Sequence, residues 1–441
     1  MPVSARLLAV AVTTAACVGA TALPATAASS SDAVVSRGVT IPEFYNPPAS
    51  LPSADGALVR SEPLPLALSL PGVDGPLPGT ATRLMYKSTD SGGRPMAVTG
   101  AYIEPTTAWK GSGARPLVAV APGTMGQGDQ CAASLGLQHP LVLNGQTVSV
   151  GYEDLAIYRL LAQGIAVVVT DYAGLGTTDR LHTYVNRVDE GHAVLDAVRA
   201  ARSLPGTSIT SASRVGLFGY SQGGGATASA AELQPSYAPD VTLSGTYAGA
   251  PPADLAEVTE AIDGSELAGA LGWSVNGFLE SDPALKPIAD AHLNAAGRAA
   301  LKDLSTMCVG DALFAYGGAH STRWTTDGRS LSDIIRSEPA LTAFLAEQRI
   351  GTLEPASPVR VATGTSDNLV PHAQARRLAA DWCAKGADVT YKPVRLPDLG
   401  SALINHFTPL LTDQGAAISW LTDRLDAKPA TSNCADLPGL S

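Results

Sequence analysis

The chain has 441 residues, 45% of them hydrophobic, and carries 40 Asp and Glu against 29 Lys and Arg, a formal net charge of −11 at pH 7. This length allows one large α/β domain with insertions or two modest domains. Because phosphate binding needs a basic stripe, the acidic balance argues against a nucleic-acid partner and against electrostatic adhesion to anionic membranes.

The N-terminus has the pattern of a secretory signal peptide. Arg6 precedes an apolar run from Leu7 to about Leu23, and Ala25-Thr26-Ala27 offers a small-residue cleavage site. We therefore expect cleavage near Ala27, removal of residues 1–27 and a secreted, extracellular mature protein. No other stretch approaches the ~20 apolar residues of a transmembrane segment.

The next part of the chain predicts an extended arm followed by a hairpin. Residues 28–80 are rich in Pro, Ser and Ala and lack a sustained period, which indicates an arm laid over the domain. Strands are then expected at 82–88 and 97–103, joined through Asp90-Ser91-Gly92-Gly93.

Short apolar strands alternate with amphipathic helices up to residue 252. Strands are expected at 116–121, 165–170, from 215 and at 241–247, and helices at 154–163, at 189–202 and after Ser221. Such alternation favours a mostly parallel sheet with helices on both faces.

The alternation is interrupted by a long helical stretch. Residues 253–349 are mainly helical in pattern, for example at 295–304 and 332–349, and we interpret them as a cap inserted over the carboxyl edge of the sheet. Alternation resumes with a strand at 359–364, a helix at 372–385, a strand at 389–394 and a helix at about 406–425. We therefore expect an α/β core made of residues 81–252 and 350–441.

The strongest chemical signal is Gly219-x-Ser221-x-Gly223, which follows an apolar strand and precedes a helix-compatible segment. This spacing is typical of a nucleophile elbow, a strained strand-to-helix turn that exposes a serine hydroxyl. The helix N-terminus beneath the serine favours developing negative charge. Ser221 is the candidate nucleophile.

A serine nucleophile needs a histidine base and a carboxylate that orients it, and after such an elbow the chain order is serine, acid, histidine. Asp367 lies just past the strand at 359–363, and His406 is expected in the loop after the final strand. Both positions fall where parallel strands end, the edge at which catalytic groups gather. His372 is the main alternative base, although its place at a helix start favours a capping or surface role.

Of the other histidines, His139, His182 and His192 precede the serine and so do not fit the chain order. His292 and His320 lie in the cap and are expected at its surface, where either could touch substrate. His192 is expected to form a local ion pair with Asp189 or Glu190.

The oxyanion of a tetrahedral intermediate needs hydrogen-bond donors. One candidate is the backbone N–H of Gln222, and the second should come from the Gly-rich loop 122–129, where we favour Thr124, with Met125 as the neighbouring possibility. The glycine spacing in this loop does not match a dinucleotide-binding fingerprint, so no cofactor is predicted.

Four cysteines remain after the expected signal peptide, Cys131, Cys308, Cys383 and Cys434. An even count in an exported chain suggests two disulfides, for which three pairings are possible. No CxxC pattern is present, so no metal site is predicted.

Five motifs in combination resemble the secretory lipase family, including exported actinobacterial members. They are Phe44-Tyr45-x-Pro47-Pro48, Gly123-Thr124 with the loop to Cys131, Asp171-Tyr172-x-Gly174-Leu175-Gly176, Gly219-Tyr220-Ser221-Gln222-Gly223-Gly224 and Gly249-Ala250-Pro251-Pro252-Ala253-Asp254-Leu255. The resemblance implies an α/β-hydrolase fold, a helical cap that controls access, and hydrolysis of acyl esters up to triacylglycerols.

Carried over residue by residue, the resemblance supports Ser221, Asp367 and His406 as a catalytic triad, with Gln222 and the Thr124 region as the oxyanion hole. It also implies the disulfide pairs Cys131–Cys308 and Cys383–Cys434.

The leading hypothesis is a secreted, cofactor-free serine ester hydrolase of the triacylglycerol lipase type, in transient contact with a lipid interface through its cap. One alternative is an esterase or peptidase of short acyl, polyester or aminoacyl substrates, and another is a hydrolase-fold binding protein without turnover. Five apolar cap residues either line an acyl tunnel or form the cap core: Leu267, Leu271, Trp273, Phe278 and Leu279.

Overall fold

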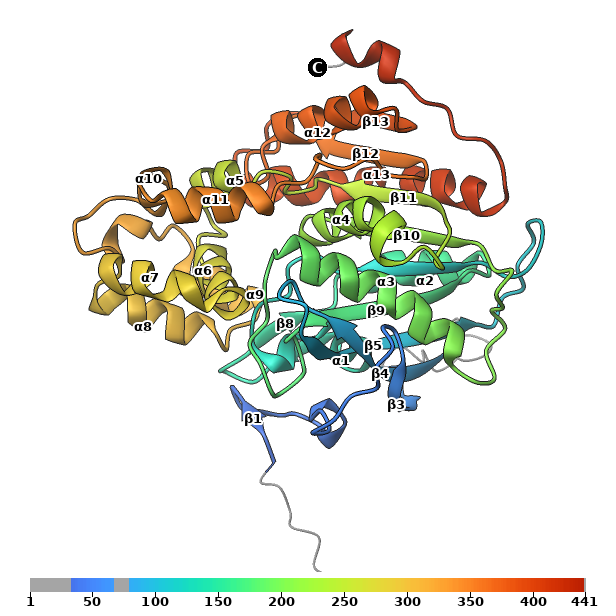
Figure 1. Cartoon of the computed structure of the whole chain (residues 1–441), viewed down its shortest axis with the longest axis horizontal. Helices are drawn as coiled ribbons and strands as arrows, with labels where there is room; N and C mark the ends of the chain where they lie inside the picture. Colours follow the sequence, from blue (N-terminus) through green and yellow to red (C-terminus); the bar gives the residue numbers. More distant parts are fainter. Residues whose placement is uncertain (1–32, 67–78, 440–441) are drawn as a thin grey trace, which may run out of the picture. The chain divides into compact units, whose positions relative to one another are not determined.

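The computed structural model describes residues 33–66 and 79–439, so the expected signal peptide, residues 1–27, lies outside the described residues. The described residues build a nine-stranded sheet (Figure 1). In spatial order its strands are β13 (Val389–Val394), β12 (Val359–Gly364), β11 (Leu243–Gly249), β10 (Val215–Tyr220), β6 (Leu117–Ala121), β9 (Ala166–Ala173), β5 (Pro95–Pro105), β4 (Gly79–Thr89) and β3 (Leu58–Leu64). The strands from β13 to β9 are parallel, and β5, β4 and β3 continue the sheet antiparallel.

Helices cover both faces of the sheet, as the continuous apolar strands predict. Successive residues of β6 enter two different cores. Leu117 and Ala119 pack with α3 (Arg187–Ser203) and α4 (Gln222–Tyr237). Val118 and Val120 pack on the other face with α2 (Asp154–Ala162) and α13 (Ala402–Leu425). Helix α12 (His372–Lys385) packs beside α4 over β12 and β13.

The expected hairpin is present as β4 and β5, each longer than predicted at both ends. The expected arm differs from the prediction at Leu58–Leu64, which form the edge strand β3 against β4. Its pattern hides the strand because Pro63 interrupts it and the register shifts between Leu58 and Arg60. Proline is tolerated in edge strands, where one side of the backbone needs no partner.

Seven described α-helices occupy the stretch between β11 and β12, and we refer to them as the cap. They are α5 (Leu255–Ile262), α6 (Ala270–Ser281), α7 (Lys286–His292), α8 (Ala295–Leu304), α9 (Val309–Tyr316), α10 (Leu331–Ser337) and α11 (Pro339–Glu347). Figure 1 shows the yellow and orange helices of the cap gathered beyond one edge of the sheet strands. The helical stretch 332–349 is divided at Glu338, because Pro339 starts a new helix.

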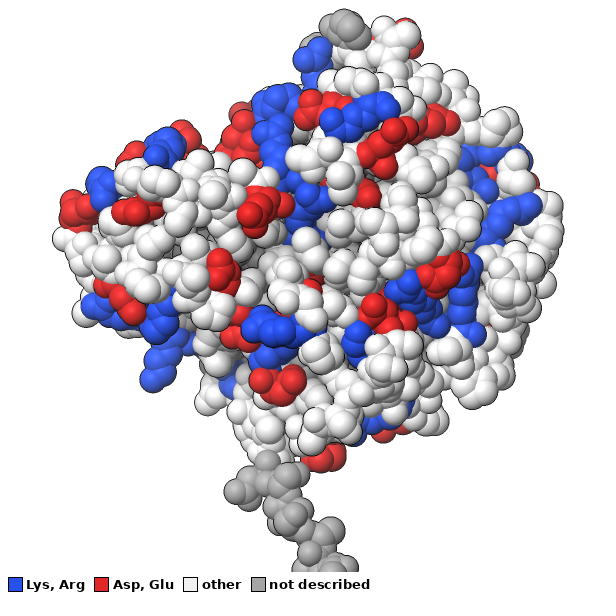
Figure 2. Space-filling view, in the orientation of Figure 1, with Lys and Arg blue, Asp and Glu red and all other residues white. Residues whose placement is uncertain are grey.

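Smaller elements complete the description, namely β1 (Val35–Ser36), β2 (Val39–Thr40), α1 (Ala133–Gln138), β7 (Leu141–Leu143) and β8 (Val148–Val150). Among the described residues, no helix combines the length and hydropathy required to cross a bilayer. Acidic and basic side chains are interspersed over the cap and the sheet region on the face shown in Figure 2.

Candidate active site

Ser221 lies on the turn between β10 and α4, with φ +59° and ψ −125°. This backbone conformation is costly for a residue with a side chain and is typical of strained functional turns. The flanking glycines are required sterically: a Cβ at Gly219 would lie 2.1 Å from the carbonyl oxygen of Gly223, and one at Gly223 would lie 2.0 Å from that of Ala121. The turn therefore has the geometry of a nucleophile elbow.

Ser221, His406 and Asp367 meet at the carboxyl edge of the sheet. The Ser221 Oγ lies 2.9 Å from His406 Nε2, and His406 Nδ1 lies 2.7 Å from Asp367 Oδ2. The His406 residue is 2% exposed. Because a carboxylate only accepts, Nδ1 carries a proton and Nε2 is left to accept the serine proton.

Asp367 is oriented by its own loop. Its Oδ1 accepts hydrogen bonds from the backbone N–H groups of Leu369 and Val370, each at 3.1 Å. The loop directly follows β12, so the strand end fixes the carboxylate that faces His406.

The prediction that His406 lies in a loop was wrong, since it lies in the second turn of α13. The helix begins earlier than expected because Ser401 caps it, its Oγ accepting from the N–H of Ile404 at 3.2 Å. Tyr220 at the end of β10 donates its hydroxyl proton to the His406 carbonyl at 2.7 Å, which ties this turn to the strand before Ser221.

The other downstream histidines have different partners. His372 Nε2 lies 3.1 Å from the hydroxyl of Tyr391, and burial lowers the pKa of this histidine. His292 Nε2 lies 2.8 Å from Glu338 Oε1, and the side chain of His320 is 61% exposed beside Asp263.

The loop after β6 is held by two buried side chains to which the sequence analysis gave no role in the site. Tyr172 donates its hydroxyl proton to the carbonyl of Pro122 at 2.6 Å, and the N–H of Gly123 donates to Glu153 Oε1 at 2.7 Å. Burial raises the pKa of the Glu153 carboxyl to about 7. Two signals pointed to Tyr172, its position directly after the apolar strand predicted at 165–170 and its place in the Asp171-Tyr172-x-Gly174 motif, and none pointed to Glu153.

Thr124 is fixed by two further tyrosines. Its carbonyl accepts from Tyr152 at 2.9 Å, and its Oγ1 lies 2.7 Å from the hydroxyl of Tyr184. The neighbouring candidate Met125 uses its carbonyl to accept from Val309 N at 2.8 Å. The N–H of Gln222 is the first of α4, and the first amides of a helix have no partner inside it.

Ser221 and His406 open onto a cavity of about 40 Å³, and a second cavity of about 80 Å³ lies inside the cap. Thr259, Ser274 and Phe278 line both. The second cavity is almost entirely apolar, with walls from α6, α7, α10 and α11.

The five apolar cap residues singled out in the sequence divide between the two expected roles. Leu267 and Phe278 line the cavity at Ser221, and Leu271, Phe278 and Leu279 line the cap cavity. Trp273 lines neither cavity; it is fully buried in the cap core and donates its indole N–H to the Leu304 carbonyl at 2.9 Å.

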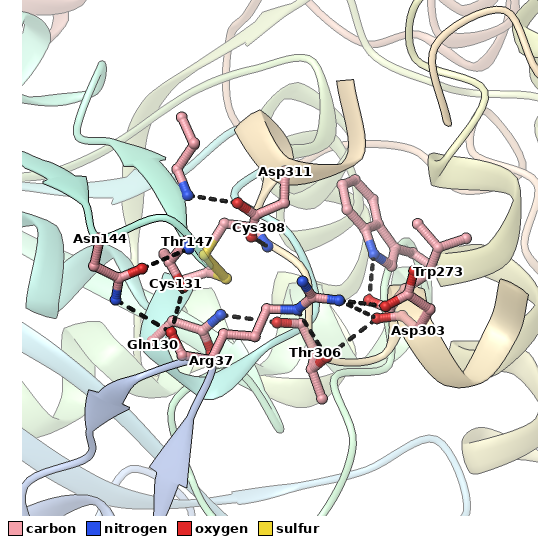
Figure 3. Close-up of a disulfide and its surroundings, with 12 residues drawn as sticks. Arg37, Gln130, Cys131, Asn144, Thr147, Trp273, Asp303, Thr306, Cys308 and Asp311 are labelled. Atoms are coloured by element: carbon pink, nitrogen blue, oxygen red, sulfur yellow. Dashed lines mark hydrogen bonds and ion pairs between the residues drawn. A yellow bond between two sulfur atoms is a disulfide. The ribbon is translucent and has the colours of Figure 1, made fainter. Parts of the chain in front are cut away.

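Two disulfides join Cys131 to Cys308 and Cys383 to Cys434, the pairs that the resemblance implies. The first links the segment after the Thr124 loop to the start of α9 (Figure 3). Hydrogen bonds reinforce the connection, from Gln127 N to the Met307 carbonyl at 2.9 Å and from Gln130 Nε2 to the Thr306 carbonyl at 2.8 Å. In the described part of the chain, no group of three or more His, Cys, Asp or Glu is arranged to hold a metal ion.

Comparison with known proteins gives the class. The family model of the secretory lipases matches residues 137–433. The chain is 31% identical to a Mycobacterium tuberculosis protein named a probable inactive lipase, over 88% of this chain and 83% of the other. It is 27% identical to lipase 10 of Candida albicans over 90% and 84% of the two chains. The chain belongs to the secretory lipase family, which confirms the resemblance.

Solved structures agree on the fold. Candida antarctica lipase A in its closed state superposes with a TM-score of 0.76 at 21% identity, over 89% of this chain and 87% of the other. A rice cell wall degrading esterase from Xanthomonas oryzae superposes with a TM-score of 0.67 at 21% identity, over 85% and 100%. The predicted α/β-hydrolase fold is confirmed, and family and fold together place the chain among the lipase and esterase hydrolases.

Proposed function

We propose that this protein is a secreted serine carboxylic ester hydrolase, a triacylglycerol lipase, that works through an acyl-enzyme on Ser221. The observation that carries the proposal is the continuous contact from Ser221 Oγ to His406 Nε2 at 2.9 Å and from His406 Nδ1 to Asp367 at 2.7 Å. A nucleophile, a base and a carboxylate in this order are the parts that acyl transfer needs.

The proposed reaction has two halves. The Ser221 oxygen attacks the ester carbonyl carbon while its proton passes to His406 Nε2, and the imidazolium then protonates the departing alcohol. Asp367 stabilises the imidazolium without taking its proton. A water molecule, deprotonated by His406, next attacks the acyl-enzyme; the bond between Ser221 Oγ and the acyl carbon then breaks, the acid leaves, and His406 returns the proton to Ser221 Oγ.

The N–H groups of Gln222 and Thr124 are the proposed donors to the oxyanion of each tetrahedral intermediate. The Gln222 amide lies at the N-terminus of α4, where the helix dipole favours negative charge. The hydrogen bonds to Pro122, Gly123 and Thr124 support the assignment, because donors must be rigid before charge develops.

The proposed substrate class follows from the cavities. An alkyl chain held at Ser221 would continue past Phe278 into the apolar cap cavity. We accordingly propose residues 253–349 as a cap or lid domain over a core of residues 81–252 and 350–441, with transient lipid contact through the cap.

The proposal includes export. Cleavage of residues 1–27 is part of it, and the two disulfides support it because such bonds persist in oxidising compartments.

The first experiment is the Ser221→Ala variant of the full chain. It should fold as the wild type does, by circular dichroism and melting temperature, and lose hydrolysis of p-nitrophenyl butyrate and labelling by a fluorophosphonate. Retained hydrolysis would dismiss Ser221 as the nucleophile. An unreactive, folded wild-type chain would instead favour a binding protein, the alternative to which the M. tuberculosis relative named a probable inactive lipase gives weight.

Substrate range requires a panel. The wild type should hydrolyse tributyrin and p-nitrophenyl esters of medium and long acyl chains faster than aminoacyl anilides. A preference for acetate over long acyl chains would establish the short-acyl alternative.

A further inference from the structure

Glu190 is a buried carboxyl that the proposed mechanism does not use. It lies in the first turns of α3 and is 3% exposed. Its Oε1 accepts from the side-chain Nε2 of Gln222 at 2.7 Å and from the backbone N–H of Val185 at 2.9 Å. Gln222 directly follows the candidate nucleophile, so this carboxyl lies immediately behind the elbow.

His182 is the second hydrogen-bond acceptor for the Gln222 side chain. His182 Nδ1 lies 2.8 Å from the Ala173 carbonyl and therefore carries the ring proton, which leaves Nε2 to accept from Gln222 Nε2 at 3.1 Å. Burial lowers the pKa of His182 to about 4, so the ring is neutral at neutral pH. The Gln222 amide group thus donates to two acceptors, both buried.

No cation in the described part of the chain pairs with the Glu190 carboxyl. Among the ion pairs of the described residues, none involves Glu190, and burial raises its pKa to about 8, with the neighbouring Asp189 adding to the rise. The other titratable groups around it are His182, Tyr172 at the end of β9 and Tyr184. Glu190 is therefore largely protonated and neutral at pH 7.

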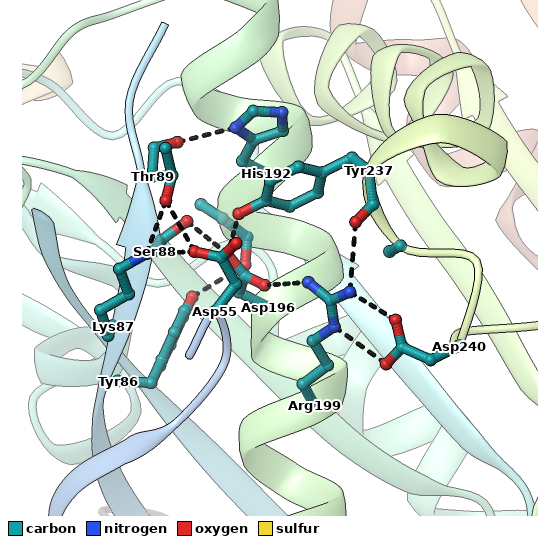
Figure 4. A network of polar contacts seen from close by, with 12 residues as sticks. Asp55, Tyr86, Lys87, Ser88, Thr89, His192, Asp196, Arg199, Tyr237 and Asp240 are labelled. Carbon is teal, nitrogen blue, oxygen red and sulfur yellow. Dashed lines mark hydrogen bonds and ion pairs between the residues drawn. The ribbon is translucent and has the colours of Figure 1, made fainter. Parts of the chain in front are cut away.

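Asp196, two turns further along the same helix, is a buried carboxylate with a structural role, and its partners differ from those of Glu190. It accepts from Ser88 Oγ at 2.6 Å, from the Tyr237 hydroxyl at 2.7 Å and from Arg199 Nη1 at 2.9 Å (Figure 4). A cation and two hydroxyls satisfy it far along α3 from the elbow. Glu190 is also buried, but its hydrogen-bond donors are two amide groups, and one of them is the side chain of Gln222.

We propose that Glu190 is a positioning residue: together with His182 it clamps the Gln222 side chain and thereby fixes the Gln222 main-chain N–H in the oxyanion hole. The inference rests on the proposed function. Fixing this residue matters because the donor must point at the oxyanion before the charge forms. Ionised Glu190 would place a negative charge behind the oxyanion, so the clamp works in its neutral form.

The experiment compares wild type, Glu190→Gln, Glu190→Ala and the matched control Asp196→Asn, all as full chains on p-nitrophenyl butyrate between pH 6 and 10. The wild-type kcat should decrease above pH about 8, where Glu190 ionises. Glu190→Gln still accepts from Gln222 but cannot ionise, so its kcat should lie within about threefold of the wild type at pH 7 and lack this alkaline decrease. Glu190→Ala removes the carboxyl that accepts from the Gln222 side chain. Its kcat should fall by about tenfold or more, with KM within about twofold of the wild type. Asp196→Asn should keep the alkaline decrease.

The inference is overturned if the Glu190→Gln profile superimposes on that of an active wild type, or if Glu190→Ala retains wild-type kcat. If Glu190→Ala does not fold, the Glu190→Gln profile decides alone. A wild type that hydrolyses no ester on the panel would be a failure of the proposed function, whereas an active wild type with unaffected Glu190 variants would be a failure of this inference only.

Discussion

The hydroxyl of Tyr172 donates a hydrogen bond of 2.6 Å to the carbonyl of Pro122, joining the ends of the adjacent parallel strands β9 and β6. Tyr172 itself has φ +67°, a conformation uncommon for a residue with a side chain. In this backbone conformation the fully buried phenol of Tyr172 points at the loop that carries Thr124. The contact therefore links the geometry of one strand end to that of the proposed oxyanion hole.

Tyr172→Phe should lower kcat by about three- to tenfold with little change in KM, because it frees the Pro122 carbonyl and loosens the loop before Thr124. Stability should fall by about 1–3 kcal/mol for the buried carbonyl left unpaired. Steady-state kinetics and urea unfolding measure both. The control is Tyr237→Phe at the far end of α4, which removes the hydroxyl that donates to Asp196 and should leave kcat unchanged. An equal loss of kcat in both variants would contradict the assignment.

Asp367→Asn should reduce kcat about 10⁴-fold while the protein stays folded, because an amide can donate to Nδ1 and then favours the wrong histidine tautomer. The contrasting variant is Asp413→Asn on α13, which breaks a buried pair with Arg360 at 2.6 and 2.8 Å. It should cost about 3–5 kcal/mol of stability and keep kcat per folded molecule. Circular dichroism and urea unfolding give the folded fraction in each case.

The two disulfides should separate activity from stability. Cys131→Ser/Cys308→Ser opens a link of 177 residues, and the loop-entropy relation gives a loss of up to about 5 kcal/mol. Cys383→Ser/Cys434→Ser opens one of 51 residues, for about 4 kcal/mol. Because only the first borders the Thr124 loop, only the first should also lower kcat. Equal specific activities of the two folded variants would contradict this.

Phe278→Trp should narrow the passage between the two cavities that Phe278 lines. Hydrolysis of p-nitrophenyl palmitate should fall about tenfold relative to butyrate, since a pocket discriminates acyl chains by the space it offers. The control is Phe314→Trp on α9, whose side chain is largely exposed. An unchanged chain-length profile in Phe278→Trp would exclude the acyl path through the cap.

Buried carboxyls should make the protein less stable as the pH rises from 5 to 8. Burial raises the folded-state pKa of Glu153 to about 7, so between its ordinary value and about 7 the folded state binds more protons than the unfolded chain. Its contribution to stability is then present at low pH and lost as the pH rises. His182 acts in the opposite sense, because its pKa of about 4 makes the unfolded chain bind more protons between pH 4 and 6.5.

Urea unfolding at pH 5, 6.5 and 8 measures this dependence. Glu153→Gln keeps an acceptor for the Gly123 N–H and should give a shallower fall in unfolding free energy from pH 5 to 8 than the wild type, with most of the difference between pH 5 and about 7. Glu347→Gln, at an exposed position of α11, should match the wild type. Parallel curves for Glu153→Gln and the wild type would refute the role of this carboxyl.

The fold was largely predictable because its signals are local. Continuous apolar strands and amphipathic helices marked β13 and the helices α8 and α12 at their observed bounds. The edge strand β3 was missed because its proline and register shift break the alternation. The loop predicted at His406 was wrong because a single N-cap, Ser401, extends α13 backwards.

The site was predictable only where chain order carries information. Ser221, Asp367 and His406 follow from the elbow and its usual order, and their roles stay a prediction that the geometry supports. Glu153 and Glu190 could not be found, since an isolated glutamate has no spacing signal. His192 shows the converse: its expected ion pair is wrong. Its Nδ1 lies 2.7 Å from the Thr89 carbonyl, and its ring stacks on Tyr237 (Figure 4).

The two cystine bridges also determine how the chain survives a proteolytic cut. One closed loop, 131–308, contains Ser221, and the other, 383–434, contains His406. A nick inside either loop, for example at the exposed turn around Gly145, leaves the fragments covalently joined. A nick between 309 and 382, such as at the cap turn around Gly328, leaves the fragment with Ser221 and the fragment with His406 without a covalent link. Packing alone then holds the two fragments together.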